Sequence, residues 1–172
     1  MAGEIVVGGT AGGIDIDFIT IPTGEPDCRY STKYAILDSN GDKIPDLHIK
    51  SVRYYYLLTY VDDELRILKN LSPNPQYYAL NNEAFISILY GPSGDEYHYF
   101  KLDILGNEVG IVNFSKRDTN QNGFFDDADE YSFNEQNVSK EEWDTLTEPY
   151  LYTDEEGREC IKNKIEWTVF CE

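Results

Sequence analysis

The stretch FISILYGPSGDEYHYFKLDILGNEVGIVNF, residues 85–114, decides the fold. Its apolar residues come in short blocks, which are separated by turn-forming residues at 91–94 and 106–107. Short apolar blocks with such breaks are typical of strands rather than helices. The Gly-Asn pair at 106–107 predicts a tight hairpin that joins strands at 97–105 and 109–114. This segment therefore predicts a run of antiparallel strands.

The same pattern continues on both sides of this segment. It predicts further strands at 14–19, 34–37, 47–49, 52–60, 65–68 and 165–170. One helix is expected at 139–147, because Ser139 and Glu142 form a capping-box pattern and Pro149 ends the segment. The length favours a single domain, 1–172. The expected fold is mainly β, an antiparallel sandwich or one large curled sheet with one short helix near 139–147.

The chain is strongly acidic. It has 14 basic and 32 acidic residues, a formal net charge of −18. This charge repels the phosphates of nucleic acids, so no nucleic acid partner is expected. There is no run of eighteen apolar residues, so no membrane span is expected, and no signal peptide is visible in residues 1–7. The 14 tyrosines suit half-buried strand surfaces or faces that contact a protein or a carbohydrate.

The cysteines and histidines do not predict a zinc site. Cys28, Cys160 and Cys171 show no metal-ligand spacing, and His48 and His98 are isolated in the sequence. One disulfide with one free thiol, or three buried thiols, both fit this odd count.

Residues 118–129, DTNQNGFFDDAD, carry the clearest chemical pattern. In this loop of twelve positions, side-chain oxygens occupy positions one, three, five, nine and twelve, and glycine occupies position six. Position seven would offer its backbone carbonyl. Ca²⁺ takes about six to eight oxygen ligands and tolerates irregular geometry. We predict a Ca²⁺ site with the ligands Asp118, Asn120, Asn122, Phe124, Asp126 and Asp129. The alternative is a plain polar turn.

The loop resembles the calcium loops of EF-hand-like proteins, and especially those of the dockerin type, which also tend to use Asp at position twelve. The resemblance covers this loop alone. An EF-hand has a helix on each side of its loop, whereas here a predicted strand, 109–114, leads in. The resemblance implies calcium binding and names no family for the whole chain.

Residues 38–46, DSNGDKIPD, form a second and weaker candidate. They resemble the Asp-x-Asn-x-Asp-Gly-x-x-Asp loops of integrin-α-type repeats and related bacterial surface proteins, in which the loop joins two strands. Lys43 stands where those loops have glycine. The implied ligands are Asp38, Asn40, Asp42, Asp46 and the carbonyl of Ile44. The alternative is a hairpin turn at 40–41, because Asn-Gly is a strong turn former.

Nothing in the sequence indicates catalysis. Nucleophile motifs, phosphate loops and dinucleotide fingerprints are all missing, so an enzyme is not favoured. The acidic cluster at 154–159 is interpreted as a solvated turn. The segment 97–100 could form a ligand face, but strand spacing favours core on one side and half-buried side chains on the other.

The composition and the two loops together predict a calcium-binding extracellular or cell-surface protein with a structural or ligand-binding role. Its cofactor would be Ca²⁺, and its ligand could be a protein or a carbohydrate. Sites of this kind suit a secreted or cell-surface location, where calcium is abundant. The alternative is a cytoplasmic acidic inhibitor or immunity protein, whose charge would steer it to a basic partner.

Overall fold

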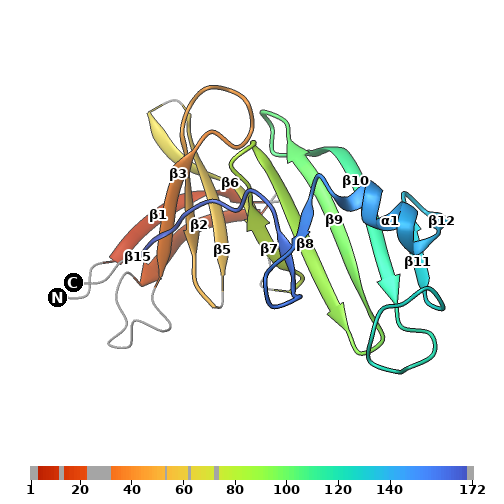
Figure 1. The fold of residues 1–172 in the computed structure, drawn as a ribbon. Coiled ribbons are helices and arrows are strands. Elements are labelled where there is room, and N and C mark those ends of the chain that lie inside the picture. The colour runs from red at the N-terminus through yellow and green to blue at the C-terminus, as the bar shows by residue number, and fades with distance from the viewer. Residues whose placement is uncertain are drawn as a thin grey trace. The chain divides into compact units, whose positions relative to one another are not determined.

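The fold is seen in a computed structural model, which describes residues 4–11, 14–22, 32–52, 54–61, 63–71 and 74–169, the first two ranges by backbone alone. These residues form antiparallel sheets and one short helix, so the predicted mainly β fold is confirmed (Figure 1). The chain divides into two compact units. Unit 1 comprises 1–73, 102–107 and 165–172, and unit 2 comprises 74–101 and 108–164. That a single domain spans both units stays a prediction.

Unit 1 contains a two-stranded hairpin and a five-stranded sheet with the order β15-β3-β4-β5-β6. Its strands are β1 (Glu4–Ala11), β2 (Ile14–Pro22), β3 (Lys33–Leu37), β4 (Asp46–Lys50), β5 (Tyr55–Val61), β6 (Glu64–Leu71) and β15 (Thr168–Val169). The strand predicted at 52–60 begins later, at Tyr55. The strand predicted at 165–170 is found only at 168–169, and Phe170 lies outside the described residues.

The core of unit 1 combines apolar and polar side chains. Ile49, Leu58 and Ile67 pack together from β4, β5 and β6. His48 of β4 is fully buried, and its Nδ1 lies 2.8 Å from the hydroxyl oxygen of Tyr55. Burial lowers the pKa of His48 to about 3, so this imidazole is neutral at ordinary pH.

Unit 2 contains a six-stranded sheet with the order β12-β11-β10-β9-β8-β7, a two-stranded hairpin and helix α1. Its elements are β7 (Gln76–Ala79), β8 (Ala84–Gly91), β9 (Gly94–Leu102), β10 (Glu108–Arg117), β11 (Glu130–Phe133), β12 (Gln136–Val138), α1 (Lys140–Thr147), β13 (Leu151–Thr153) and β14 (Glu159–Ile161). The predicted hairpin turn is present, with Gly106 at a φ of +80°. The strand before this turn ends at Leu102 rather than at Leu105, because Asp103 begins the turn by accepting the backbone N–H groups of Leu105 and Asn107.

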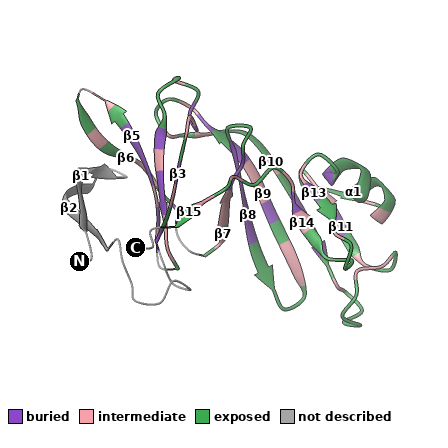
Figure 2. Ribbon diagram, turned by 60° about the vertical axis from the view of Figure 1, so that its left-hand side comes forward, coloured by how far each residue is buried: buried purple, intermediate pink, exposed green. Residues whose placement is uncertain are grey.

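Helix α1 and the β13–β14 hairpin pack on one face of the six-stranded sheet. Tyr97 and Phe114 stack on this face with ring centroids 4.8 Å apart. Trp143 of α1 is buried against them, 6.2 Å from the ring of Phe114 and 5.7 Å from that of Tyr131. Aromatic pairs in such tilted and stacked arrangements contribute beyond the area that they bury. Along β8, buried residues at 84–88 give way to exposed ones at 89–91 (Figure 2).

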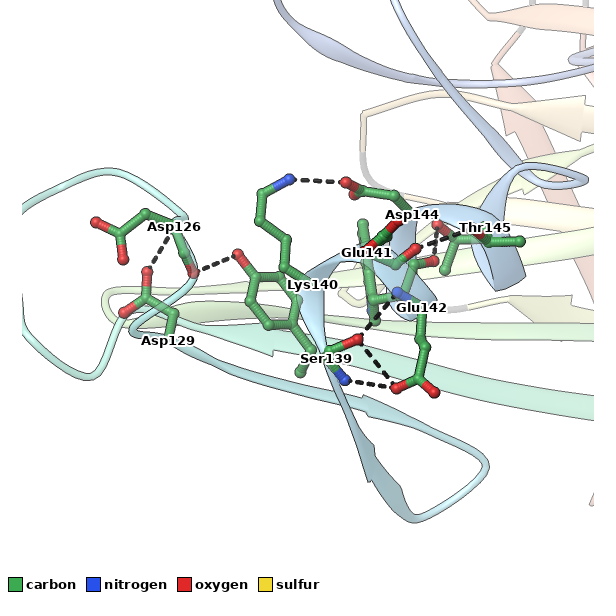
Figure 3. A network of polar contacts seen from close by, with 11 residues as sticks. Asp126, Asp129, Ser139, Lys140, Glu141, Glu142, Asp144 and Thr145 are labelled. Atoms are coloured by element: carbon green, nitrogen blue, oxygen red, sulfur yellow. Dashed lines mark hydrogen bonds and ion pairs between the residues drawn. The ribbon is translucent and has the colours of Figure 1, made fainter.

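Helix α1 begins where the capping box predicts. The backbone N–H of Glu142 donates to Ser139 Oγ at 3.2 Å, and the N–H of Ser139 donates to Glu142 Oε2 at 3.0 Å (Figure 3). Both bonds satisfy amide groups that the first turn of a helix leaves without partners. Within the described part of the chain, no helix is long and apolar enough to cross a membrane.

Cys160 of β14 is a free thiol, whereas Cys28 and Cys171 lie outside the described residues.

Replacing Ser139 by Ala removes the side-chain oxygen that caps α1. We expect the free energy of unfolding to fall by about 0.5–2 kcal/mol, as for other helix caps. Urea denaturation measures the change. The matched control is Ser139→Asn, which keeps a capping oxygen and should retain most of the stability. Equal losses in the two variants would contradict a capping role.

Candidate functional site

The loop at 118–129 connects two neighbouring antiparallel strands. Arg117 at the end of β10 pairs with Glu130 at the start of β11, so the loop closes a hairpin. The strand that the sequence predicts before the loop is therefore present, and a second strand follows the loop. This frame differs from the helix–loop–helix arrangement of an EF-hand, as the sequence predicts.

Side-chain oxygens in the first half of this loop point towards its backbone amides. The carboxylate of Asp118 accepts the N–H groups of Asn122 and Gly123 at 3.2 and 2.8 Å. Asn120 Oδ1 accepts the N–H of Asn122 at 2.9 Å, and Asn122 Oδ1 accepts the N–H of Phe124 at 2.8 Å. The side chain of Phe124 is 75% exposed. Three of the predicted ligand side chains therefore turn their oxygens inward along one short segment.

The second half of the loop is held by two aspartates (Figure 3). Asp129 accepts the N–H of Asp126 at 2.8 Å and the N–H of Thr119 at 3.0 Å. These amide bonds, chiefly the one from Asp126, hold the pKa of Asp129 below its usual value. Asp126 Oδ2 in turn accepts the side-chain amide of Asn122 at 3.0 Å, which links the two halves of the loop.

The loop at 38–46 also closes a hairpin, because Leu37 of β3 pairs with Asp46 of β4. Asp38 Oδ2 accepts the N–H of Lys43 at 2.9 Å, and Asp38 Oδ1 accepts the N–H of Gly41 at 2.8 Å. Asp42 Oδ1 accepts the N–H of Ile44 at 2.7 Å.

The two loops share one hydrogen-bonding arrangement. In each, the oxygen at position one accepts the amide of position six, the oxygen at position three accepts the amide of position five, and the oxygen at position five accepts the amide of position seven. The corresponding residues are Asp38 and Asp118, Asn40 and Asn120, Asp42 and Asn122, Lys43 and Gly123, and Ile44 and Phe124. The 38–46 loop belongs to unit 1, and the 118–129 loop belongs to unit 2.

Position six is left-handed in both loops. Gly123 has a φ of +83° and Lys43 a φ of +69°. Glycine takes this conformation without strain, whereas lysine adopts it at a cost of about 1–2 kcal/mol. In both loops the N–H at position six donates to the aspartate at position one, from Lys43 to Asp38 and from Gly123 to Asp118. The loop therefore forms although its sequence departs from the resembling loops at this position.

Asp46, at position nine, is the most unusual of the candidate ligands. Its side chain is fully buried. Asp46 Oδ2 accepts the N–H of Ser39 at 2.9 Å, while Oδ1 has no hydrogen-bond partner among the described residues. Burial, followed by smaller effects that include the charges of Asp42 and Asp38, raises the pKa of Asp46. The Thr59 hydroxyl has the opposite effect on this pKa, although no hydrogen bond of ordinary geometry joins it to Oδ1. A buried carboxylate oxygen without a partner is costly in a folded protein.

The predicted ligands of each site thus lie on one loop, but their carboxylates do not form a tight cluster. In the described parts of the chain, no group of three His, Cys, Asp or Glu side chains is arranged to hold a metal ion. Two of the six predicted ligands of the 118–129 loop are asparagines and a third is a backbone carbonyl. The unpartnered oxygen of Asp46 could not be foreseen, because its burial depends on the sheet.

The acidic residues at 154–159 have structural contacts. Asp154 accepts the N–H groups of Glu156 and Arg158 and so closes the turn between β13 and β14. Glu159 Oε1 lies 2.9 Å from Nζ of the buried Lys116. These contacts fit the interpretation of the segment as a turn.

Compared with known proteins, the chain matches no protein-family model, and it has no significant match among curated proteins or solved structures.

Replacing Gly123 by Ala tests the left-handed conformation of the 118–129 loop. A Cβ at this position would meet no atom within 4 Å, so backbone strain is the only cost. We expect a loss of about 1 kcal/mol in the free energy of unfolding, measured by urea denaturation. Gly123→Asn is the control and should lose less, because Asn tolerates positive φ. An alanine variant as stable as the wild type would contradict this geometry.

Proposed function

We propose that the protein binds calcium ions at the loops 118–129 and 38–46, one in each compact unit, and that it is a secreted or cell-surface protein with a structural or ligand-binding role. The observation that carries the proposal is the hydrogen-bonding arrangement that the two loops share. Two segments with different sequences in different sheets direct the same kinds of oxygen to the same positions. The oxygens at positions one, three and five accept backbone amides of the turn, and each loop has a further carboxylate at position nine.

The ligand chemistry favours calcium. Each loop offers carboxylate and amide oxygens together with a carbonyl at position seven, and the 118–129 loop adds a carboxylate at position twelve. Ca²⁺ takes about six to eight oxygens at roughly 2.3–2.6 Å, and its coordination is flexible enough for a loop. Mg²⁺ demands a near-ideal octahedron and retains several waters, so it fits such a loop less well.

The absence of a tight carboxylate cluster is compatible with this proposal. The inward oxygens of both loops are bonded to backbone amides, and such oxygens have a second lone pair for a cation. An ion would also offset the repulsion among carboxylates in a chain with a net charge of −18. Binding at ten times the dissociation constant would add about 1.4 kcal/mol to the stability of the folded protein.

Calcium titration tests the first site. Isothermal titration of chelator-treated protein with millimolar Ca²⁺ should release or absorb heat, and Asp118→Ala should abolish the contribution of the 118–129 loop because position one loses its carboxylate. Asp127→Ala is the matched control, since Asp127 lies in the same loop but outside the predicted ligand positions. The site is refuted if the wild type gives no heat, or if both variants bind as it does.

The second site is tested by stoichiometry. Asp42→Ala should lower the number of bound calcium ions from two to one, as the calorimetric titration reports. Lys43→Gly should tighten binding at this loop, because it removes both the left-handed strain and a cation near the proposed ion. Lys101→Gln, which removes an exposed cation outside the loop, is the control and should leave the affinity unchanged. An unchanged stoichiometry in Asp42→Ala would leave 38–46 as a hairpin turn only.

A further inference from the structure

The six-stranded sheet of unit 2 has a second face, opposite α1. Successive side chains of a strand point to opposite faces, so the neighbours of the buried Tyr97 turn away from the core. Glu96 and His98 are these neighbours on β9, and Ser87 of β8 pairs with His98. Part of this second face is therefore lined with polar side chains from adjacent strands, beside the buried rings of Phe85 and Phe100 on the same face.

The second face is hollowed into a groove. One hollow of about 480 Å³ extends from Tyr77 on β7 to Ser132 on β11. A second hollow of about 310 Å³ continues towards the loop 91–94. Glu96, Ser115 and Ser132 line both hollows, so the two form one groove that runs across the strands. The volume of each hollow lies within the range of small-molecule sites, about 300–1,000 Å³.

The floor of the groove is held in place by contacts between its own side chains. His98 Nδ1 lies 2.6 Å from Asn113 Oδ1, and His98 Nε2 lies 2.9 Å from Glu108 Oε2. The hydroxyl oxygens of Ser115 and Ser132 are 2.8 Å apart. Polar groups that are already positioned lose little conformational entropy when a ligand binds. Both nitrogens of His98 are used in these contacts, so the floor offers hydroxyl, amide and carboxylate groups in a fixed order.

An aromatic ring stands at one end of the groove. Tyr77 is half-buried, and its ring meets that of Phe100 edge-on with centroids 6.3 Å apart. Burial, with a smaller effect of Glu108, raises the pKa of Tyr77, so its hydroxyl stays protonated. A positioned aromatic ring offers an apolar face beside a hydrogen-bonding group.

The charge of the chain and of the groove limits the chemical class of ligand that the groove could bind. The net charge of −18 disfavours polyanions. Two carboxylates of the groove already face a cation or His98: Glu108 contacts His98, and Glu130 lies 3.9 Å from Arg117. This reduces the negative charge that could attract a basic peptide. A neutral ligand rich in hydroxyl groups, with an apolar face for Tyr77, matches the lining best.

We propose that the groove across β7–β11 binds a neutral oligosaccharide. Sugar hydroxyls would bond to Asn113 and the serines of the floor, and the C–H face of one sugar ring would lie on Tyr77. This inference rests on the proposed ligand-binding role and names the class of ligand. It is independent of calcium, although the 118–129 loop joins the two strands, β10 and β11, that line one end of the groove.

Affinity electrophoresis in native gels tests the groove. The gels contain dextran, galactomannan, arabinoxylan, mixed-linkage β-glucan or hydroxyethyl cellulose, and at least one of these should retard the full chain. Tyr77→Ala and Asn113→Ala should weaken retardation about tenfold, as expected when a central contact of a binding site is removed. Tyr152→Ala and Asn81→Ala, which alter exposed side chains outside the groove, should bind as the wild type does.

Ser132→Ala provides a test that stays valid if the larger substitutions prevent folding. It removes a single hydroxyl from the floor, so the fold should survive while retardation still weakens. The proposal is overturned if no polysaccharide retards the wild type, or if Ser132→Ala and the folded groove variants bind unchanged. It is also overturned if an oligolysine peptide binds in the groove and the polysaccharides do not.

Each gel is run in EDTA and in millimolar Ca²⁺, so that the groove and the calcium sites are judged separately. Retardation in both conditions supports the groove whether or not calorimetry detects calcium. Calcium binding without retardation leaves the proposed calcium sites in place and rejects the groove.

Discussion

The need to satisfy backbone amides in two tight loops is the constraint on which the candidate sites depend. A loop that leaves a strand loses the sheet partners of its N–H groups, and those groups need other acceptors. In both loops an aspartate that directly follows a strand supplies them: Asp38 after β3 and Asp118 after β10. The same bonds close the hairpins and aim the oxygens inward. Turn formation and a potential cation site are therefore products of one arrangement.

This arrangement also concentrates negative charge. Hydrogen bonds from amides stabilise a carboxylate, as the lowered pKa of Asp129 illustrates. They do not remove the repulsion between carboxylates on the same loop, and a chain with a net charge of −18 offers few cations to offset it. Under the proposed function, a bound calcium ion would offset this repulsion. The loops would then be folded before the ion arrives, and binding would carry a small cost in conformational entropy.

Local patterns in the sequence were sufficient for much of this structure. The hairpin at 106–107, the helix after Ser139, the strands on both sides of the 38–46 loop and the strand before the 118–129 loop depend on neighbouring residues, and all of them are found. The strand after the 118–129 loop, β11, was not predicted. The left-handed backbone of Lys43 could not be foreseen from propensity, because lysine disfavours positive φ and here lies in a loop closed by hydrogen bonds such as the one from its N–H to Asp38. Such a contact is local, but its strength depends on the geometry of the closed loop.

Features that depend on how the strands pair into sheets could not be predicted from the sequence. The division into two units follows from which strands pair, and strand pairing links residues far apart in the chain. The groove was missed for the same reason. Alternation along 97–100 predicts core on one side and half-buried side chains on the other, whereas the structure buries Tyr97 on one face and Phe100 on the other. Alternation also does not predict that Asn113 and Ser132 from other strands would line up beside His98.

The two loops differ in how they could hold an ion. The 118–129 loop is mostly exposed and has a carboxylate at position twelve, so its affinity would come from the number of oxygens and would be weakened by salt screening. The 38–46 loop ends at position nine, and its fully buried Asp46 is shielded from solvent. A low local dielectric strengthens the attraction between a carboxylate and a cation, but both groups must lose water to meet there. Folding buries the Asp46 side chain, and its Oδ1 has no hydrogen-bond partner among the described residues. A cation at this loop would therefore gain a ligand whose desolvation has been completed by the fold, which compensates in part for the missing twelfth position.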